Sequence, residues 1–433
     1  MSEVGMVAAI LLGGFSVFFL IGVPIAISLG VATVLALMYL GTPTMELVQG
    51  AMIASDSFPF LAVPFFILAG QLMETGGLSR RLIGVAAALM GHVTGGLAMV
   101  TIMACAFFAA ISGSGPATTA AIGSIMIPAM LKRGYTKEFA GAVSSSGGTL
   151  GILIPPSIPM VVYGIVGNVS ITDMFLAGII PGIFVALAFM ITAWLISRKH
   201  GFHGTGEPFS VTKFFKALNE AKAALMAPLI ILGGIYGGIF TPTEAAVVAV
   251  VYGMFCGFFI YRELKLSDVP KMLMETAMIT GSVMIIIGFA TAFGRLMTMY
   301  QIPQMVATWM QGVTNDKFLL LMIINVFLLF VGMFMETVAQ IIILTPLFMP
   351  MAAKLGIDPI QLGIVFVINC ELGFLTPPVG VNLFVASNIA KVSIEKLSKA
   401  VIPFIIALFV SVTIISYFPD IALWLPKYLK SLR

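Results

Sequence analysis

Apolar runs long enough to cross a lipid bilayer recur along the whole chain, and short polar segments separate them. A membrane-spanning helix needs about 20 predominantly apolar residues. Runs of this length or longer lie at 6–22, 24–40, 57–78, 135–167, 172–197, 223–239, 243–261, 272–297, 358–390 and 400–418. Two further stretches, 82–131 and 318–353, are each long enough to enter and leave the membrane on one side. The pattern predicts an all-α polytopic membrane protein with ten crossings and two re-entrant helical hairpins.

Composition agrees with a membrane location and narrows the possible partners. Of the 433 residues, 60% are hydrophobic and 9% are charged, whereas a soluble domain carries about 25% charged residues. The formal net charge of +4 is too small and too scattered to indicate nucleic-acid binding. The three cysteines lie within apolar stretches, which favours packing roles over a disulfide framework or a metal cluster.

The positions of the basic residues orient the predicted crossings. Lys and Arg are retained on the cytoplasmic side during insertion. With residue 1 outside, 16 of the 22 basic residues fall inside. The six that fall outside are Arg295, Lys317, Lys354, Lys427, Lys430 and Arg433. We therefore expect both termini to lie outside, on the side opposite the cytoplasm.

The longest polar stretch, 198–222, divides the chain almost in half. Within it, 211–222 has apolar residues on one side of a helix, which predicts a cytoplasmic connector lying along the membrane surface. The units on either side are 1–197 and 223–433.

The two units match each other. Four prolines of the first unit recur exactly 222 residues later in the second unit. The pairs are Pro128 with Pro350, Pro155 with Pro377, Pro156 with Pro378, and Pro181 with Pro403. Each unit contributes five crossings, an odd number, so the second copy enters the membrane inverted. Inverted repeats of this kind build secondary transporters, with the binding site where the copies meet.

Glycine and proline predict interruptions at four places. The hairpin tips are predicted at 112–116 and 332–337, and broken crossings at 144–156 and 369–378. Backbone groups released within the membrane must line a cavity or bind something. Freed carbonyl groups suit a hard cation and helix N-termini suit an anion. This predicts two cation sites with an anion between them.

Three of the carboxylates within or beside the apolar runs are candidates for a specific role. Glu336 and Glu371 lie at the predicted tip and break of the second unit. Ionisable groups at membrane depth are functional candidates, but these two could equally hold the break together, so both roles stay open. Glu244 follows Thr241-Pro242-Thr243, and we interpret it as a helix cap.

These features together resemble the large membrane subunit of tripartite ATP-independent periplasmic (TRAP) transporters. The resemblance covers essentially the whole chain and is carried by three sets of residues. They are GIFTPTEAA at 238–246, SGSGPA at 112–117, and the two Gly-x-Leu-x-Pro-Pro segments at 151–156 and 373–378. The resemblance implies sodium-coupled uptake of an organic anion, such as sialic acid or a four-carbon dicarboxylate, across the bacterial inner membrane by an elevator movement. It also implies a periplasmic substrate-binding protein and a small four-helix membrane subunit, expected as a separate chain because residue 1 already begins the first repeat.

The resemblance also assigns site residues. One sodium site is expected to join Ser112 to the carbonyl groups of Gly151, Leu153 and Pro156. The second is expected to join Thr337, or its neighbour Met335, to the carbonyl groups of Gly373, Leu375 and Pro378. The substrate carboxylate is expected between the tips, near Ser114, Ser145, Ser146 and Asn382. No organic cofactor or transition metal is expected.

Other functions remain as alternatives. The nearest is a stand-alone sodium–dicarboxylate symporter of similar two-hairpin architecture. An intramembrane serine hydrolase would use Ser112 or Ser114, but the chain has only three histidines and none is predicted beside that tip. A purely structural membrane scaffold would show no sodium-dependent flux. The sequence therefore favours a transporter and not an enzyme.

Overall fold

The secondary structure of the described residues is entirely helical. A computed structural model describes residues 3–55, 58–202, 204, 208–314 and 316–431. The first helices are α1 (Glu3–Ala8), η1 (Ala9–Gly13), α2 (Gly14–Leu20), α3 (Ile25–Leu40), α4 (Met45–Ser55), η2 (Phe58–Leu61), α5 (Ala62–Thr75) and α6 (Leu78–Met90). Next come α7 (Gly96–Ser112), α8 (Gly115–Lys132), α9 (Lys137–Leu153), α10 (Ile158–Val166), α11 (Ile171–His200), α12 (Val211–Glu220) and α13 (Lys222–Tyr236). The rest are α14 (Pro242–Phe255), η3 (Cys256–Ile260), η4 (Leu266–Asp268), α15 (Val269–Met299), α16 (Ile302–Val313), α17 (Lys317–Gly332), α18 (Thr337–Lys354), α19 (Pro359–Phe374), α20 (Val381–Ala390), α21 (Ile394–Tyr417) and α22 (Asp420–Ser431).

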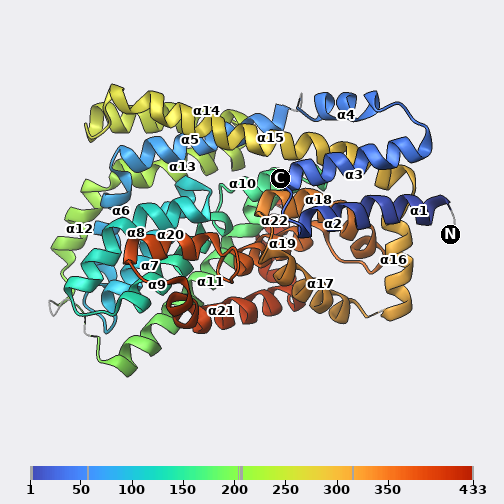
Figure 1. Cartoon of the computed structure of the whole chain (residues 1–433). Coiled ribbons are helices and arrows are strands. Elements are labelled where there is room, and N and C mark those ends of the chain that lie inside the picture. Colours follow the sequence, from blue (N-terminus) through green and yellow to red (C-terminus); the bar gives the residue numbers. More distant parts are fainter. Residues whose placement is uncertain (1–2, 56–57, 203, 205–207, 315, 432–433) are drawn as a thin grey trace.

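The helices form a side layer and a body (Figure 1). In the side layer, α5 packs against α14 and α15, and α15 packs against α3 and α4. In the body, α9 contacts α7, α8, α20 and α21, while α19 contacts α17 and α21. Helices far apart in sequence thus lie side by side, as α8 and α20 do.

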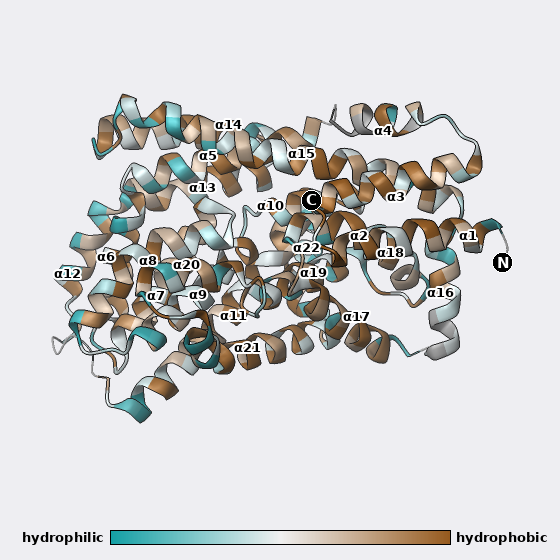
Figure 2. Cartoon of the chain, in the orientation of Figure 1, coloured by the Kyte–Doolittle hydropathy of each residue, from teal (hydrophilic) through white to brown (hydrophobic). Residues whose placement is uncertain are grey.

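Seven helices of the described residues are long and apolar enough to cross a membrane, or up to nine if each bent pair of helices is one span. Figure 2 shows apolar residues along most of these helices, with hydrophilic positions gathered at the end that carries α6 and α12. Five further apolar helices, α3, α7, α17, α19 and α20, are 10–17 residues long. The ten crossings stay a prediction.

The helix boundaries of the two halves follow the spacing of the prolines. Helices α8 and α18 each contain 18 residues, and their first residues are Gly115 and Thr337, again 222 apart. The interruptions between α9 and α10 and between α19 and α20 fall at the two Pro-Pro pairs, as predicted. Both Pro-Pro peptide bonds are cis.

Three details of the predicted interruptions were wrong. Residues 144–149 lie within α9, where the Ser145 and Thr149 hydroxyl groups donate to the carbonyl groups of Ala142 and Ser146 at 3.1 and 2.7 Å. Residues 369–373 lie within α19, where the Asn369 amide donates to the Val365 carbonyl at 2.8 Å. The stretch 82–131 contains most of a separate helix, α6, before the α7–α8 pair.

Three helices were not predicted: α4, α16 and α22. All three are 11 or 12 residues long, shorter than a membrane crossing. The amphipathic connector helix was predicted at 211–222 and forms as α12 at Val211–Glu220. Positions 203 and 205–207 of the connector lie outside the described residues.

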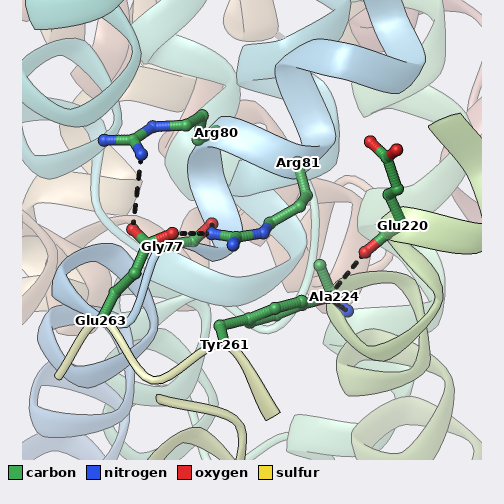
Figure 3. Close-up of polar contacts among 7 residues, drawn as sticks. All are labelled: Gly77, Arg80, Arg81, Glu220, Ala224, Tyr261 and Glu263. Carbon is green, nitrogen blue, oxygen red and sulfur yellow. Dashed lines mark hydrogen bonds and ion pairs between the residues drawn. The ribbon is translucent and has the colours of Figure 1, made fainter.

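A polar cluster joins the start of α6 to the segment that follows η3 (Figure 3). Arg81 forms an ion pair with Glu263, and its guanidinium lies 4.1 Å from the centre of the Tyr261 ring. The Tyr261 hydroxyl accepts a hydrogen bond from the Ala224 N–H at 3.1 Å and donates to the Glu220 carbonyl at 3.3 Å. Burial raises the pKa of the Tyr261 phenol, so the hydroxyl keeps the proton that it donates.

Candidate functional site

A cavity of about 230 Å³ lies where the two predicted tips meet, and helices of the side layer complete its wall. The first tip contributes residues 112–117 and the second contributes Glu336, Thr337 and Val338. Residues beside both interruptions also line it: Ile152, Ile158, Pro159, Phe374 and Val381. Ile67, Gly70, Gln71 and Glu74 of α5 and Ile279 and Val283 of α15 form the opposite side. The space is therefore bounded by both halves of the chain.

The first tip is a tight turn held by its own hydroxyl groups. Gly113 has a φ of 61°, in the left-handed region that favours glycine. The Ser112 and Thr118 hydroxyl oxygens lie 2.6 Å apart, and Thr118 also donates to the Ser114 carbonyl at 2.8 Å. The Ile158 N–H donates to the Gly113 carbonyl at 3.4 Å. This last bond fixes the tip to the interruption between α9 and α10.

The second tip is fixed to the other interruption in the same way. The Val379 N–H donates to the Met333 carbonyl at 3.1 Å. Glu336 is the N-cap of α18, where its carboxylate accepts from the Val338 and Ala339 N–H groups at 2.9 and 3.1 Å. Thr337 is 2% exposed, and its hydroxyl oxygen has no hydrogen-bond partner among the described residues.

Two matched glycines allow each tip to approach its interruption. A Cβ on Gly151 would lie 2.8 Å from the carbonyl carbon of Ser114. A Cβ on Gly373 would lie 2.6 Å from the Cα of Gly332. Real Cβ atoms do not come this close to backbone atoms, so both positions require glycine for the observed packing.

Some of the residues predicted to bind sodium lie at or beside the cavity, and others lie away from it. Ser112 and Thr337 line the cavity, and the Pro156 carbonyl oxygen lies beside Gly113. The Leu153 carbonyl oxygen instead faces Gly178 on α11. In the second half, the Gly373 carbonyl accepts from the Thr376 N–H at 3.0 Å. Met335 and Leu375 are buried, whereas Pro378 is exposed.

The residues predicted for the substrate are not all at the cavity. Ser114 lines it. Ser145, Ser146 and Asn382 are fully buried and are not among its lining residues. Asn382 donates to a Glu371 carboxylate oxygen at 3.1 Å, so its amide already belongs to a buried pair.

The wall formed by the side layer was missed from sequence. Gln71 and Glu74 are polar residues within or at the end of an apolar run, which is the one local signal that marks them. The Gln71 carbonyl oxygen accepts from the Thr276 hydroxyl at 3.3 Å, joining α5 to α15.

The prediction for Glu244 was correct, since Glu244 and Thr241 form a reciprocal capping box at the start of α14.

Comparisons with known proteins identify the family of the chain. The family model described as "Tripartite ATP-independent periplasmic transporter, DctM component" matches residues 12–421. The isethionate TRAP transporter permease protein DctMQ of Oleidesulfovibrio alaskensis is 47% identical over 96% of this chain, which spans 66% of that relative. The C4-dicarboxylate TRAP transporter large permease protein DctM of Pseudomonas aeruginosa is 44% identical, covering 87% of this chain and 88% of the relative. The sialic acid TRAP transporter large permease protein SiaM of Vibrio cholerae is 39% identical, covering 86% of this chain and 87% of the relative.

Solved structures share the fold at low sequence identity. The YdaH transporter of Alcanivorax borkumensis superposes with a TM-score of 0.62 at 16% identity, covering 89% of each chain.

Because the named relatives are permease proteins, the chain is a transporter component and not an enzyme, as predicted. The family match over nearly the whole length and the identity to complete large permeases lead to one conclusion. The chain belongs to the DctM family, the large membrane component of tripartite ATP-independent periplasmic transporters.

Proposed function

We propose that the chain carries a small organic anion into the cell by sodium-coupled secondary transport. The observation that carries this proposal is the cavity between the two tips, since both halves and the side layer contribute to it. The named relatives transport isethionate, C4-dicarboxylates and sialic acid, and all of these are anions. The substrate is accordingly a carboxylate such as sialic acid or a four-carbon dicarboxylate, or a sulfonate.

Sodium binds where each tip meets the interruption of its own half. In the first site Ser112 lies at the tip, the carbonyl groups of Gly151 and Leu153 belong to the last turn of α9, and that of Pro156 belongs to the interruption. In the second site, Thr337 or Met335 combines with the carbonyl groups of Gly373, Leu375 and Pro378. The backbone bond from each tip to its interruption supports this pairing, and oxygen ligands suit a hard cation.

The substrate anion binds against the first tip. Ser114 lines the cavity there, and the N-terminus of α8 begins at Gly115, where an anion is favoured. Asn382 lies beside Gly115 of this tip, and the proposed substrate site also includes Ser145 and Ser146 of α9.

The halves are inverted repeats, and the transport movement is an elevator. The shared spacing of helix boundaries supports the repeat. The tips and interrupted helices form the moving body, and the side layer with α5 and α15 remains fixed. The chain spans the bacterial inner membrane with both termini periplasmic.

Two partners complete the system. A periplasmic binding protein delivers the substrate, and a small four-helix membrane subunit supports the carrier, as the description of the family as tripartite implies. We propose the small subunit as a separate chain. Relatives such as DctMQ and SiaT are longer, with this chain spanning 66% of each.

The test is uptake into liposomes that hold both membrane subunits, with the binding protein outside and sodium varied at constant ionic strength. Ser112→Ala and Thr337→Ala should each raise the sodium concentration for half-maximal uptake about tenfold, the effect of losing one ligand worth roughly 1.4 kcal/mol. Ser16→Ala and Thr298→Ala are matched controls, because these exposed hydroxyls bond only within their own helices. Uptake by the wild type without sodium would refute sodium coupling. Unchanged sodium dependence in both site variants would refute the placement, and uptake without the binding protein would favour a stand-alone symporter.

A further inference from the structure

The two carboxylates of the second half have different surroundings. The Glu336 carboxylate accepts two backbone hydrogen bonds as the N-cap of α18. Glu371 is 0% exposed and accepts one hydrogen bond, from the Asn382 amide to Oε2 at 3.1 Å. Its other oxygen, Oε1, has no partner among the described residues. A capping role therefore accounts for Glu336 but not for Glu371.

A second unpartnered oxygen lies in the same pair of side chains. Asn382 is also 0% exposed, and because its Nδ2 donates to Glu371, its Oδ1 is left without a partner among the described residues. Both side chains face the first tip. A Cβ on Gly115 would lie 3.0 Å from Glu371 Oε1 and 3.2 Å from Asn382 Nδ2. Two buried acceptor oxygens without donors thus belong to one hydrogen-bonded pair of side chains, which lies where the tip of one half contacts α19 and α20 of the other.

These oxygens need a positive charge or a donor. Buried carboxylates are paired, bind metals or become neutral. None of the ion pairs found among the described residues includes Glu371. The same residues contain no group of three or more His, Cys, Asp and Glu side chains that could hold a metal ion. One carboxylate and one amide oxygen provide a single negative charge with hard ligands, which matches a monovalent alkali cation and not a transition metal.

We propose that Glu371 Oε1 and Asn382 Oδ1 bind a further sodium ion at the contact between the first tip and the second interrupted helix, with water completing its coordination. This site differs from the two sites proposed above, because each of those joins a tip to the interruption of its own half. It rests on the proposed sodium coupling and increases the number of sodium ions bound by one. Binding there joins the two halves of the chain.

The test is saturation binding of radioactive sodium to the purified membrane complex, with choline as the replacement cation and binding expressed per chain. Glu371→Gln keeps the shape of the side chain and removes its charge, and it should lower the number of bound ions by one. Asn382→Ala keeps the carboxylate and should weaken the same site at least tenfold. Glu244→Gln and Asn219→Ala are the controls, because both side chains are exposed and lie outside the cluster; their binding should equal that of the wild type.

Each outcome decides one point. A wild type that binds no sodium would refute sodium coupling itself, and this inference with it. A wild type that binds sodium, with Glu371→Gln and Asn382→Ala binding the same number of ions at the same affinity, would refute only the new site and indicate a proton or water at Glu371. If Glu371→Gln fails to fold, Asn382→Ala alone decides, since it leaves the carboxylate in place.

Discussion

Replacing Gly373 by alanine tests the close approach on which the geometry of the second tip depends. The added Cβ would lie 2.6 Å from the Cα of Gly332, whereas carbon atoms in contact normally lie about 3.5–4.0 Å apart. The two backbones would therefore have to separate by about 1 Å. Overpacking costs about 1–3 kcal/mol, and a contact with backbone on both sides belongs at the upper end. Alanine returns at most about 1 kcal/mol through helix propensity, so we expect a net loss of about 2 kcal/mol.

The matched control is Gly84→Ala in α6, where the Cβ would meet nothing within 4 Å. At that position only the difference in helix propensity matters, so alanine should raise the free energy of unfolding by up to about 1 kcal/mol. Thermal unfolding in detergent, followed by intrinsic fluorescence, should rank Gly373→Ala below the wild type and Gly84→Ala at or above it. Gly151→Ala should behave like Gly373→Ala, because its Cβ would lie 2.8 Å from the carbonyl carbon of Ser114. A Gly373→Ala protein that melts as high as Gly84→Ala would contradict the packing of tip against interruption.

Three further predictions concern polar contacts around this framework. Arg81→Lys keeps the charge beside Glu263 but loses the planar contact with Tyr261, and should lower the free energy of unfolding by about 1 kcal/mol, measured by thermal unfolding. The control is Arg80→Lys, at a side chain that is 71% exposed, which should leave the free energy of unfolding almost unchanged. Equal losses in the two variants would contradict this reasoning. Glu336→Ala removes the N-cap of α18 and should cost about 1 kcal/mol, whereas a loss of sodium-dependent uptake at unchanged stability would show that Glu336 acts on the transported ions instead. Thr241→Ala breaks the capping box of α14 and should likewise cost about 1 kcal/mol, with the sodium dependence of uptake unchanged; a shifted sodium dependence would place that turn in the transport cycle.

Sequence patterns located the backbone features of the site better than its walls. Two adjacent prolines remove two successive N–H donors from a helix, and glycine adopts left-handed backbone, so the interruption at Pro155-Pro156 and the tip at Gly113 could be predicted from local chemistry. Single prolines such as Pro128 and Pro181 instead lie inside helices. The polar run at 144–149 misled the prediction, because serine and threonine can remain in a helix by bonding to a carbonyl of the preceding turn, as Ser145 and Thr149 do. The contributions of Gln71 and Glu74 could not be predicted, since they depend on how α5 packs against the tips.

The halves share a backbone plan but differ in charge, and this difference bears on how an anion is bound. At the 222-residue spacing, Ser114 matches Glu336 and Thr149 matches Glu371. The N-terminus of α18 is therefore already occupied by a carboxylate, whereas Ser114 makes no side-chain cap at the N-terminus of α8. We expect an anion at the first tip to lie near Glu371, whose carboxylate, when ionised, would repel it from beside Gly115. Sodium bound at the site proposed above would remove that repulsion, so we expect it to increase the affinity for the anion. By thermodynamic linkage the anion must then increase the affinity for sodium by the same factor.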